Sequence, residues 1–505
     1  MSLARSVQAQ PGFEFFEPVQ PPRRVQVMAH RGLKMLAPEN TGAAILGCYS
    51  DFIEWAEVDV RLTHDGQHVI WHDTTVERLT SGTGRVADQT LAQLQQLDAG
   101  TWWAPRFQNT RLLSLAELLT LTRGKVNLYL DCKQVDPARL VQEIRAAKME
   151  SQVVVYGNPE LLAAVRDNAG ESIPRMTKFH PRTDNFDQFL TTMEPAAVEL
   201  DAADVTVELC CAFHNAGVRV QAKVLGAEWD QPAIWDKMIT AGVDWLQTDD
   251  PVGVRFHEVR RRIGRFPVQI AYHRGANRYA PENTVAAIRQ ATACGADYVE
   301  IDIQTSRDGQ FVLLHDRTLN RTTNGQGPVS DQPLEALRRL DAGAWFGKPF
   351  AGTQVPLLDE GLAALGDVSR VYLDAKNIPP ADLVAATRKH ALLERHVVYQ
   401  SLDYCRKLRE LEPAMRLLPP LKTPADFDKV ASIQPFGVDA AWSALSAELI
   451  QRCHAANVQV FSDALGLHET VADYRQALRW GIDVIQTDHP LRVLRAIELE
   501  QDNPQ

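Results

Sequence analysis

Short runs of β-branched and other apolar residues alternate along this chain with segments in which apolar residues recur every three or four positions. The runs predict strands and the periodic segments predict helices, such as Leu112–Thr122 and Pro137–Ala147. In the first half of the chain the expected strands are Val25–Ala29, Ala56–Val60, His68–Trp71, Val126–Leu130, Gln152–Tyr156, Arg175–Lys178, Val218–Ala222 and Asp244–Gln247, with a weaker run at Ala197–Leu200. Strands that alternate with helices indicate βα units and a parallel sheet. Eight units in ~240 residues favour a (β/α)8 barrel over a doubly wound open sheet, because no GxGxxG sequence follows the first strand.

The polar positions within this pattern occur twice. His30-Arg31-Gly32 recurs as His273-Arg274-Gly275, and Glu57-x-Asp59 recurs as Glu300-x-Asp302, at a constant spacing of 243 residues (273 − 30, 302 − 59). Four further motifs repeat at the same spacing: Pro-Glu-Asn-Thr, His-Asp, Leu-Asp-Ala-Gly and Asp-x-Lys. They begin at Pro38, His72, Leu97 and Asp131, and again at Pro281, His315, Leu340 and Asp374. A spacing this long indicates a duplicated domain rather than a solenoid repeat.

We therefore predict two tandem (β/α)8 TIM-type barrels, each with a small insertion after its third strand. The expected domains are a proline-containing N-terminal tail over residues 1–24, a first barrel over residues 25–264 and a second barrel over residues 265–505. A basic helix over Pro251–Arg265 is expected to close the first copy.

The overall composition excludes several classes of protein. Apolar residues make up 45% of the 505 residues and charged residues 23%, which is typical of globular proteins. The net charge is −11, so binding to nucleic acid is not expected. The seven cysteines form no CxxC pair, which argues against a disulfide framework and a structural zinc site. No apolar run is long enough for a membrane span or a signal peptide, so a cytoplasmic location is slightly favoured; a periplasmic or secreted one stays open if a leader has been removed.

The repeated polar residues fall at the carboxyl ends of the expected strands, where (β/α)8 barrels carry their active sites. Residues two apart on a strand point to the same side, so Glu57 and Asp59 converge, as do Asp131 and Lys133. Crowded carboxylates raise one another's pKa unless a cation holds them, and oxygen ligands select a hard ion such as Mg²⁺ or Ca²⁺. Arg31 and Lys133 would clamp a phosphate beside that ion. With two histidines to remove and deliver a proton, the set points to phosphodiester cleavage.

Both halves resemble glycerophosphodiester phosphodiesterases, within the phospholipase-C-like phosphodiesterase superfamily. The resemblance rests on the HRG, PENT, ExD and HD motifs, LDAG-x-W, a late T-D-x-P and a T-x-x-R-x-T-x-G-x-G segment after the HD motif. It covers nearly all of the chain after residue 24. It implies a (β/α)8 barrel with an insertion, here about residues 74–112 and 317–355. It also implies divalent-metal hydrolysis of glycerophosphodiesters to glycerol 3-phosphate and an alcohol, with one Mg²⁺ or Ca²⁺ in each barrel.

The resemblance further implies a role for each repeated residue. His30 and His273 would act as general base on the glycerol 2-hydroxyl, which attacks the phosphorus within the same molecule. His72 and His315 would protonate the leaving alkoxide, and water would then open the cyclic phosphate. The metal ligands would be Glu57, Asp59, Asp131, Glu300, Asp302 and Asp374. The phosphate oxygens would be held by Arg31, Lys133, Arg274 and Lys376. Glu39 and Glu282 would line the mouth, where they would either hold other side chains or bind substrate hydroxyls.

Two departures from the family pattern bear on the substrate. The family usually has Glu where Asp131 and Asp374 stand, and the shorter side chain requires the ion to shift or a water to bridge. The family also often has Trp-Thr-Val-Asn at the end of the next-to-last strand. Here the matching stretches are Gln221-Ala222-Lys223-Val224 and Val460-Phe461-Ser462-Asp463. The two copies therefore need not share a substrate.

Other repeated residues have a structural interpretation. His214 and His454 are expected to pack at the opposite end of the barrel. Asp98 and Asp341 are expected to form turns, and Asp249 and Asp488 to order the final loop. The aromatic pairs Trp102-Trp103 and Trp345-Phe346 either cover a lipid-like substrate or pack the insertion onto the barrel.

Two alternative functions stay open. One is a lysophospholipase-D-like or phosphatidylinositol-cleaving enzyme, although the insertions contain few of the apolar runs that such enzymes direct at membranes. The other is one active barrel beside one binding barrel, although neither copy has lost a histidine or a carboxylate. The sequence leaves the headgroup, the choice between Mg²⁺ and Ca²⁺ and the oligomeric state undetermined.

Overall fold

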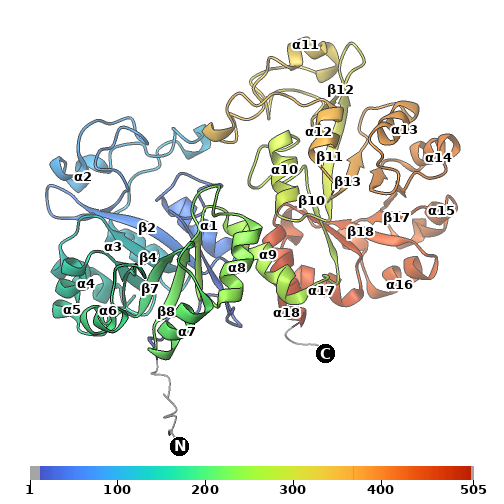
Figure 1. Cartoon of the computed structure of the whole chain (residues 1–505). Helices are drawn as coiled ribbons and strands as arrows, with labels where there is room; N and C mark the ends of the chain where they lie inside the picture. Colours follow the sequence, from blue (N-terminus) through green and yellow to red (C-terminus); the bar gives the residue numbers. More distant parts are fainter. Residues whose placement is uncertain (1–11, 368, 502–505) are drawn as a thin grey trace, which may run out of the picture. The chain divides into compact units, whose positions relative to one another are not determined.

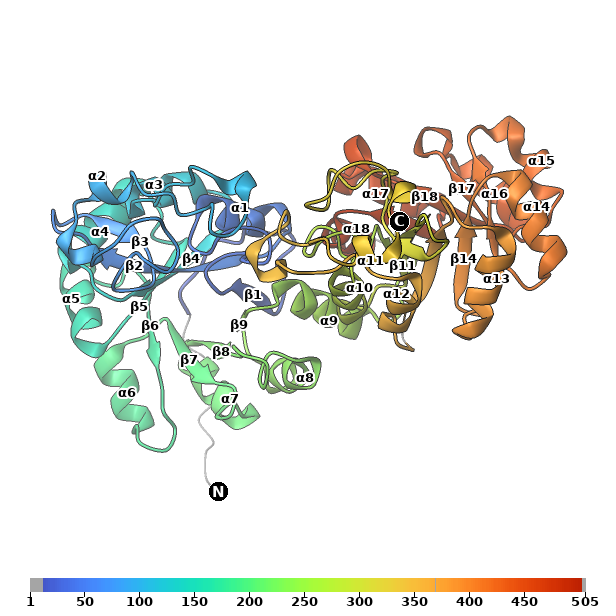
Figure 2. The same ribbon diagram turned by 90° about the horizontal axis from the view of Figure 1, so that it is seen from above.

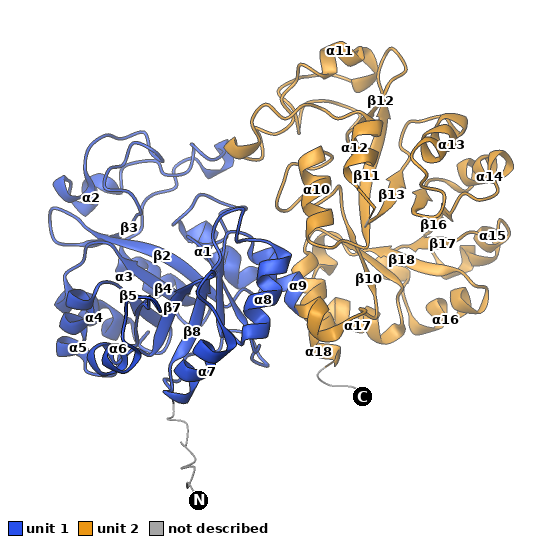
Figure 3. Ribbon diagram, in the orientation of Figure 1, with its two compact units in different colours: residues 1–258 blue, residues 259–505 orange. Residues whose placement is uncertain are grey.

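The computed structural model describes residues 12–367 and 369–501 (Figure 1). The chain divides into two compact units, and the division falls between Glu258 and Val259 (Figure 3). Each unit is a barrel of parallel strands with helices outside it.

The first unit alternates strands and helices along the sequence. Its elements are β1 (Gln26–Ala29), α1 (Gly42–Ser50), β2 (Trp55–Leu62), β3 (His68–Ile70), α2 (Leu91–Leu94), α3 (Leu115–Thr122), β4 (Asn127–Cys132), α4 (Pro137–Ala147), β5 (Val153–Tyr156), α5 (Pro159–Ala169), β6 (Arg175–Lys178), α6 (Phe186–Met193), β7 (Ala197–Asp201), α7 (Val207–Asn215), β8 (Arg219–Lys223), α8 (Pro232–Ala241) and β9 (Trp245–Thr248), followed by α9 (Pro251–Ile263). Seen from above, α6, α7 and α8 lie outside the strands of this barrel (Figure 2).

The strands of the first unit close into a barrel of eight parallel strands. Their order is β1-β9-β8-β7-β6-β5-β4-β2, and β1 pairs with both β9 and β2, which completes the ring. The weak run at 197–200 is one of these eight strands, β7. The predicted (β/α)8 architecture is confirmed.

The strand predicted at His68–Trp71 is not part of the ring. β3 pairs antiparallel with the end of β2, with Val60 opposite Ile70 and Leu62 opposite His68. Only residues 63–67 separate the two strands, which is too short for the crossover that a parallel pair requires. His72 therefore follows a hairpin beside the barrel mouth rather than a barrel strand.

The second unit repeats this arrangement. Its elements are β10 (Gln269–Tyr272), α10 (Val285–Ala293), β11 (Tyr298–Thr305), β12 (Phe311–Leu313), α11 (Leu334–Leu337), α12 (Leu358–Ala364), β13 (Arg370–Asp374), α13 (Pro380–Lys389), β14 (His396–Tyr399), α14 (Leu402–Leu411), β15 (Leu417–Leu418), β16 (Pro420–Leu421), α15 (Phe427–Ala431), β17 (Gly437–Ala440), α16 (Ala447–Ala455), β18 (Gln459–Asp463), α17 (Val471–Trp480), β19 (Val484–Thr487) and α18 (Pro490–Gln501). β15 pairs with β14 and β16 pairs with β17, so these two short strands, separated only by Pro419, together fill one place in the ring.

Aromatic side chains fill the first barrel at the amino-terminal end of its strands, where Trp55 begins β2 and Trp245 begins β9. Phe15, from the segment before β1, is buried with its ring centroid 5.4 Å from that of Trp55 and 5.0 Å from that of Trp245. The same segment is held by backbone contact, since the N–H of Phe16 donates to the carbonyl of Ser151. Residues 12–24 therefore include a plug for the barrel.

The insertions form small apolar clusters of their own beside the mouth. In the first unit Trp102 packs against a cluster that includes Val69 and Leu94, and its indole N–H donates to the carbonyl of Ala99. Trp103 is buried. Of the two interpretations left open for these tryptophans, packing is the one that the structure supports. None of the described helices combines the length and apolarity needed to span a membrane.

Candidate active site

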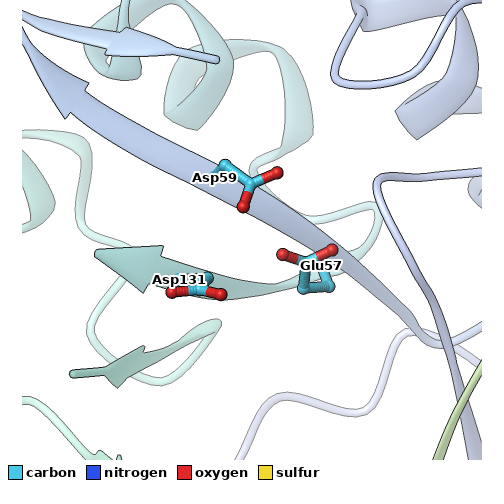
Figure 4. Close-up of side chains that lie close together, drawn as sticks. All are labelled: Glu57, Asp59 and Asp131. Atoms are coloured by element: carbon cyan, nitrogen blue, oxygen red, sulfur yellow. The ribbon is translucent and has the colours of Figure 1, made fainter. Parts of the chain in front are cut away.

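Three carboxylates converge at the carboxyl end of the first barrel. Glu57 and Asp59 lie on β2 and Asp131 lies opposite Asp59 on the neighbouring strand β4 (Figure 4). Carboxylate oxygens of the three residues lie within 4.8 Å of one another. Glu57 and Asp59 are almost fully buried, whereas Asp131 faces the opening.

The loops after β1 hold two of these carboxylates through unusual backbone conformations. Arg31 has a φ of 60°, and in this left-handed conformation its backbone N–H donates to Glu57 Oε2 at 2.7 Å. Asn40 has a φ of 58°, and its side-chain amide donates to Asp59 Oδ2 at 2.8 Å. Gly32 follows at a φ of 76°, and a Cβ atom there would lie 2.9 Å from the backbone of Ala44. The HRG and PENT motifs therefore position the acidic cluster.

The electrostatics of the cluster favour a cation. Burial, reinforced by the negative charges of Asp59 and Asp131, raises the pKa of Glu57 well above its usual value. Three ionised carboxylates this close are stable only with a positive charge between them. Because every donor is a carboxylate oxygen, the residues present fit a hard divalent cation such as Mg²⁺ or Ca²⁺.

One histidine of the mouth is oriented by an aspartate from the other end of the sequence. His30 Nδ1 lies 2.7 Å from Asp249 Oδ1, which also accepts a hydrogen bond from Lys34. The other ring nitrogen, Nε2, faces Glu57 Oε2 at 4.0 Å. Burial lowers the pKa of His30, which favours the neutral ring. We expected Asp249 to order the final loop; it instead pairs with the histidine, because β1 and β9 are neighbours in the closed ring.

The second histidine, His72, belongs to a network of hydrogen-bonded charged groups. His72 Nδ1 lies 2.7 Å from Asp73, and Asp73 accepts from Arg78, which also donates to Glu39. Burial acts to raise the pKa of Asp73, but the hydrogen bonds from Arg78 and His72 outweigh it and lower the pKa to about 2. Glu39 also accepts a hydrogen bond from Arg31, at 2.8 Å, so this network extends to the residues beside the acidic cluster.

The cations predicted to clamp phosphate lie beside the carboxylates. Lys133 Nζ is 2.5 Å from Asp131 Oδ2 and 3.3 Å from Asp59 Oδ1. The guanidinium of Arg31 lies between Glu39 and Asp59, with its Nε 3.5 Å from Asp59 Oδ2. Both cations therefore border the place where the cluster opens.

The second barrel repeats this geometry. Oxygens of its three carboxylates also lie within 4.8 Å of one another; they are Glu300, Asp302 and Asp374. His273 Nδ1 lies 2.7 Å from Asp488, and His315 Nδ1 lies 2.7 Å from Asp316. The remaining predicted residues are placed as their counterparts are, with Lys376 on Asp374 and Asp302, and Glu282 between Arg274 and Arg321.

One neighbour of the His30–Asp249 pair differs between the barrels. Lys34, which bonds Asp249 in the first barrel, is replaced by Asn277, which bonds Asp488 in the second. The structure thus brings together every site residue predicted from the sequence. It adds partners that the motifs contained without an assigned role, above all Asn40, Asp73 and Arg78.

The residues expected to be structural lie away from the mouth or within turns. His214 and His454 bond Asp244 and Asp483, directly before β9 and β19, at the opposite end of each barrel. Asp98 accepts from the backbone N–H groups of Gly100 and Thr101 and so forms a turn. Both predictions are confirmed.

The two halves match one protein family. The model of the glycerophosphoryl diester phosphodiesterase family matches residues 30–252 and again residues 273–492. The glycerophosphodiester phosphodiesterase of Caldanaerobacter subterraneus subsp. tengcongensis is 30% identical over 235 residues, which are 45% of this chain and 96% of the relative. That of Bacillus subtilis is 32% identical over 248 residues, which are 43% of this chain and 82% of the relative. The crystal structure of the Agrobacterium tumefaciens glycerophosphodiester phosphodiesterase is 32% identical, covers 45% of this chain and 99% of its own, and has a TM-score of 0.41.

Proposed function

This chain belongs to the glycerophosphoryl diester phosphodiesterase family along both of its halves, and from this premise we propose that each half is a complete catalytic domain. The chain is a phosphoric diester hydrolase that acts on glycerophosphodiesters. The proposed domains, residues 25–264 and 265–505, each release glycerol 3-phosphate and an alcohol. The observation that carries the proposal is the convergence, in each mouth, of three carboxylates, two of them buried, with two His–Asp pairs.

Each carboxylate triad is proposed to hold one divalent cation, Mg²⁺ or Ca²⁺. The ligands would be Glu57, Asp59 and Asp131 in the first barrel, and the support for this role is their all-oxygen chemistry and mutual proximity. A bound divalent ion polarises a phosphoryl oxygen and offsets the negative charge that develops on it. The second barrel would use the corresponding residues Glu300, Asp302 and Asp374.

The histidines are proposed to move the protons of an intramolecular reaction. His30 Nε2 takes the proton of the glycerol 2-hydroxyl, whose oxygen attacks phosphorus and displaces the alcohol. His72 gives a proton to the departing alkoxide. The cyclic phosphate is then opened by water, with His72 as base and His30 as acid. His273 and His315 perform the same steps in the second barrel.

The cations and the mouth glutamates are proposed to hold the phosphate. Lys133 and Arg31 donate to its oxygens, as Lys376 and Arg274 do in the second barrel. Glu39 and Glu282 each contact two arginines, which supports a role in holding those arginines in place.

The proposal is tested by a substrate screen with and without chelator. Glycerophosphocholine, glycerophosphoethanolamine, glycerophosphoglycerol and glycerophosphoinositol are incubated with the protein, and glycerol 3-phosphate is measured. We expect release from at least one diester, loss of release in EDTA, and recovery with Mg²⁺, Mn²⁺ or Ca²⁺. Full activity in excess chelator would contradict the metal assignment.

The same assay tests the internal nucleophile. A diester that lacks the 2-hydroxyl should bind but turn over at least ~10²-fold more slowly, because the base has no hydroxyl to activate. Equal rates for the two substrates would indicate direct attack by water instead.

A further inference from the structure

The two mouths differ at the last residue of the next-to-last strand. Lys223 ends β8 in the first barrel and Asp463 ends β18 in the second, and each is the register partner of a glutamine on the final strand, Gln247 or Gln486. The two residues therefore occupy equivalent places, with opposite charges.

A second difference lies on the adjacent wall. Lys178 of β6 stands in register with Glu199 of β7, whereas Pro420 of β16 stands in register with Asp439 of β17. The second barrel lacks Lys178 here, but it also lacks Asp201, the partner of that lysine, because the counterpart of Asp201 is the neutral Ala441. The two mouths therefore differ on this wall by the two units of charge between Lys223 and Asp463, which makes the second mouth the more acidic one.

In the first barrel Glu199 and Lys178 both have protein partners, whereas Lys223 forms no ion pair with any described residue. Glu199 accepts hydrogen bonds from the hydroxyls of Tyr129 at 3.1 Å and Tyr156 at 3.3 Å, and Lys178 pairs with Asp201 at 2.6 Å. Among the described residues, Lys223 has no carboxylate within ion-pair distance. Its charge still reaches the acidic cluster, since burial raises the pKa of Asp131 and the ammonium groups of Lys133 and Lys223 oppose that rise. The charge of Lys223 also opposes the rise that burial causes in the pKa of Glu199. Because no described carboxylate holds Lys223 in an ion pair, its ammonium group can bind an anionic ligand.

In the second barrel the wall carries carboxylates without protein partners. Asp439 is 9% exposed, and within the described part of the chain neither its Oδ1 nor that of Asp463 has a hydrogen-bond partner, although both atoms are buried. The aspartate side chain at 439 is one methylene shorter than Glu199, and no described tyrosine hydroxyl bonds it. A buried carboxylate oxygen without a partner costs free energy, so a donor is expected from outside the protein.

These carboxylates lie on the inner side of the second barrel, because Asp439 is the register partner of Phe461, a residue of the barrel core, and Asp463 follows Phe461 by two positions on β18. Burial raises the pKa of Asp463 to about 6, and the charges that act on it belong to His273, Asp374, Lys376 and Asp302. Asp439 does not complete another three-carboxylate cluster, because among the described acidic residues of this unit only Glu300, Asp302 and Asp374 bring their oxygens within 4.8 Å of one another. The missing donors are therefore expected from a substrate rather than from another metal ion.

We propose that this position selects substrates by charge: Lys223 gives the first barrel a site for an anionic group, and Asp463 with Asp439 gives the second barrel a site for a hydroxyl or ammonium group. The inference rests on the proposed function, in which His273 acts on the glycerol 2-hydroxyl. The group next to that hydroxyl is the substituent on C1 of the glycerol. The first barrel thus accepts a diester phosphorylated at C1, and the second requires a hydrogen-bond donor there.

The test uses three diesters that share the scissile bond and the choline headgroup and carry a hydroxyl, an ammonium or a phosphate at C1. The His315→Ala protein reports the first barrel and the His72→Ala protein reports the second. In kcat/KM we expect the phosphate diester to exceed the ammonium diester by at least about 10-fold in the first barrel, and the reverse in the second.

Reciprocal substitution should invert these ratios. Lys223→Asp in the first barrel and Asp463→Lys in the second reverse the preference, while Lys223→Gln and Asp463→Asn reduce it without reversal. The neutral pair keeps the proposal testable if a charge reversal prevents folding, which circular dichroism detects. Ratios that are equal in both barrels, or unmoved by the substitutions, would overturn the proposal.

Two further measurements separate the possible failures. A headgroup series of choline, glycerol and serine diesters should not distinguish the barrels; if it does while the C1 series does not, the placement at the glycerol end is wrong. Calorimetric binding of 2-deoxy versions of the C1 series reads the charge preference without turnover. Absence of turnover with every diester would refute the proposed function, whereas equal binding of the charged analogues would refute this inference.

Discussion

Each histidine of the mouths is held by an aspartate, and the proton it can move depends on that contact. Asp249 accepts from Nδ1 of His30, which leaves Nε2 free of a proton and facing Glu57. An asparagine can donate to Nδ1 and so favour the other tautomer. We therefore expect Asp249→Asn, measured in the His315→Ala protein, to lower kcat by about 10²–10⁴-fold with a smaller change in KM.

The matched control is the same kind of pair at the other end of the same barrel. His214 Nε2 lies 2.8 Å from Asp244, and Asp244→Asn should leave kcat of the folded protein unchanged. The pH profile of kcat/KM should change for Asp249→Asn alone. Equal loss for both variants would mean that Asp249 acts only through stability.

A buried histidine of the second barrel links stability to pH. Burial lowers the pKa of His396 to about 4; its Nε2 accepts from the backbone N–H of Arg416 and its Nδ1 donates to the carbonyl of Leu392. In the unfolded chain the pKa is about 6.5, so the unfolded state binds the proton first as the pH falls. The contribution is full above pH ~6.5 and is lost toward pH ~4. At pH 4.5 this residue should lower the free energy of unfolding by about 2–3 kcal/mol relative to pH 7.5.

The control comes from the first barrel, where Val153 begins the equivalent strand β5. His396→Val should remove this part of the pH dependence. Urea unfolding at pH 7.5 and 4.5 measures it for both proteins. The same pH dependence in wild type and variant would show that other groups are responsible.

The site residues that belong to a local sequence motif were predictable from the sequence. The contacts between residues far apart in the sequence were not, because they form only when the barrel folds. Glu57 and Asp59 converge because of the two-residue period of a strand, which the sequence displays. The partnership of His30 with Asp249 spans 219 residues and exists only because the barrel closes. Asn40 was visible in its motif, but its bond to Asp59 depends on a left-handed backbone that the letters alone do not specify.

Among the elements, the segment before β1 makes a contribution of its own. Phe15 packs against Trp55 and Trp245 and fills the first barrel at the amino-terminal end of its strands. Truncation of a buried Phe leaves a cavity and costs about 3–5 kcal/mol. Phe15→Ala should therefore lower the free energy of unfolding of the first unit by about 3 kcal/mol, followed by tryptophan fluorescence in urea.

The neighbouring exposed residue provides the comparison. Glu14→Ala should change the free energy of unfolding by less than about 0.5 kcal/mol. Activity of the second barrel, measured in the His72→Ala background, should be unaffected by Phe15→Ala under native conditions. An unchanged unfolding curve for Phe15→Ala would show that the segment is dispensable.

The hydrophobic pattern alone does not distinguish a barrel strand from a hairpin strand in this protein. The run at His68–Trp71 has the same character as the barrel strands, yet β3 forms a hairpin because the connection to β2 is five residues long (residues 63–67). The weaker run at Ala197–Leu200 lies between α6 and α7 and is a barrel strand. Connection length, rather than apolar content, distinguishes the two.

At the scale of the whole molecule, each unit contains every residue that the proposed reaction requires. The HRG, ExD, HD and DxK motifs of each copy lie within one unit, and the carboxylates of each triad come from two strands of one barrel. Nothing in either mouth has to be supplied by the other copy. The differences, Lys34 against Asn277 and Lys223 against Asp463, lie around the reacting groups rather than among them.

Two complete sites predict two independent activities. His72→Ala should remove the first barrel's turnover and His315→Ala the second's, each by about 10²–10⁴-fold within its own barrel, because the leaving alkoxide then departs without a proton donor. On a diester that both barrels accept, the rates of the single variants should sum to that of the wild type, and the double variant should be inactive. On a diester that only one barrel accepts, one single variant should be inactive and the other fully active. If either single variant were as inactive as the double variant on every diester tested, one barrel would be inert or coupled to the other, and the duplication would serve something other than two parallel catalysts.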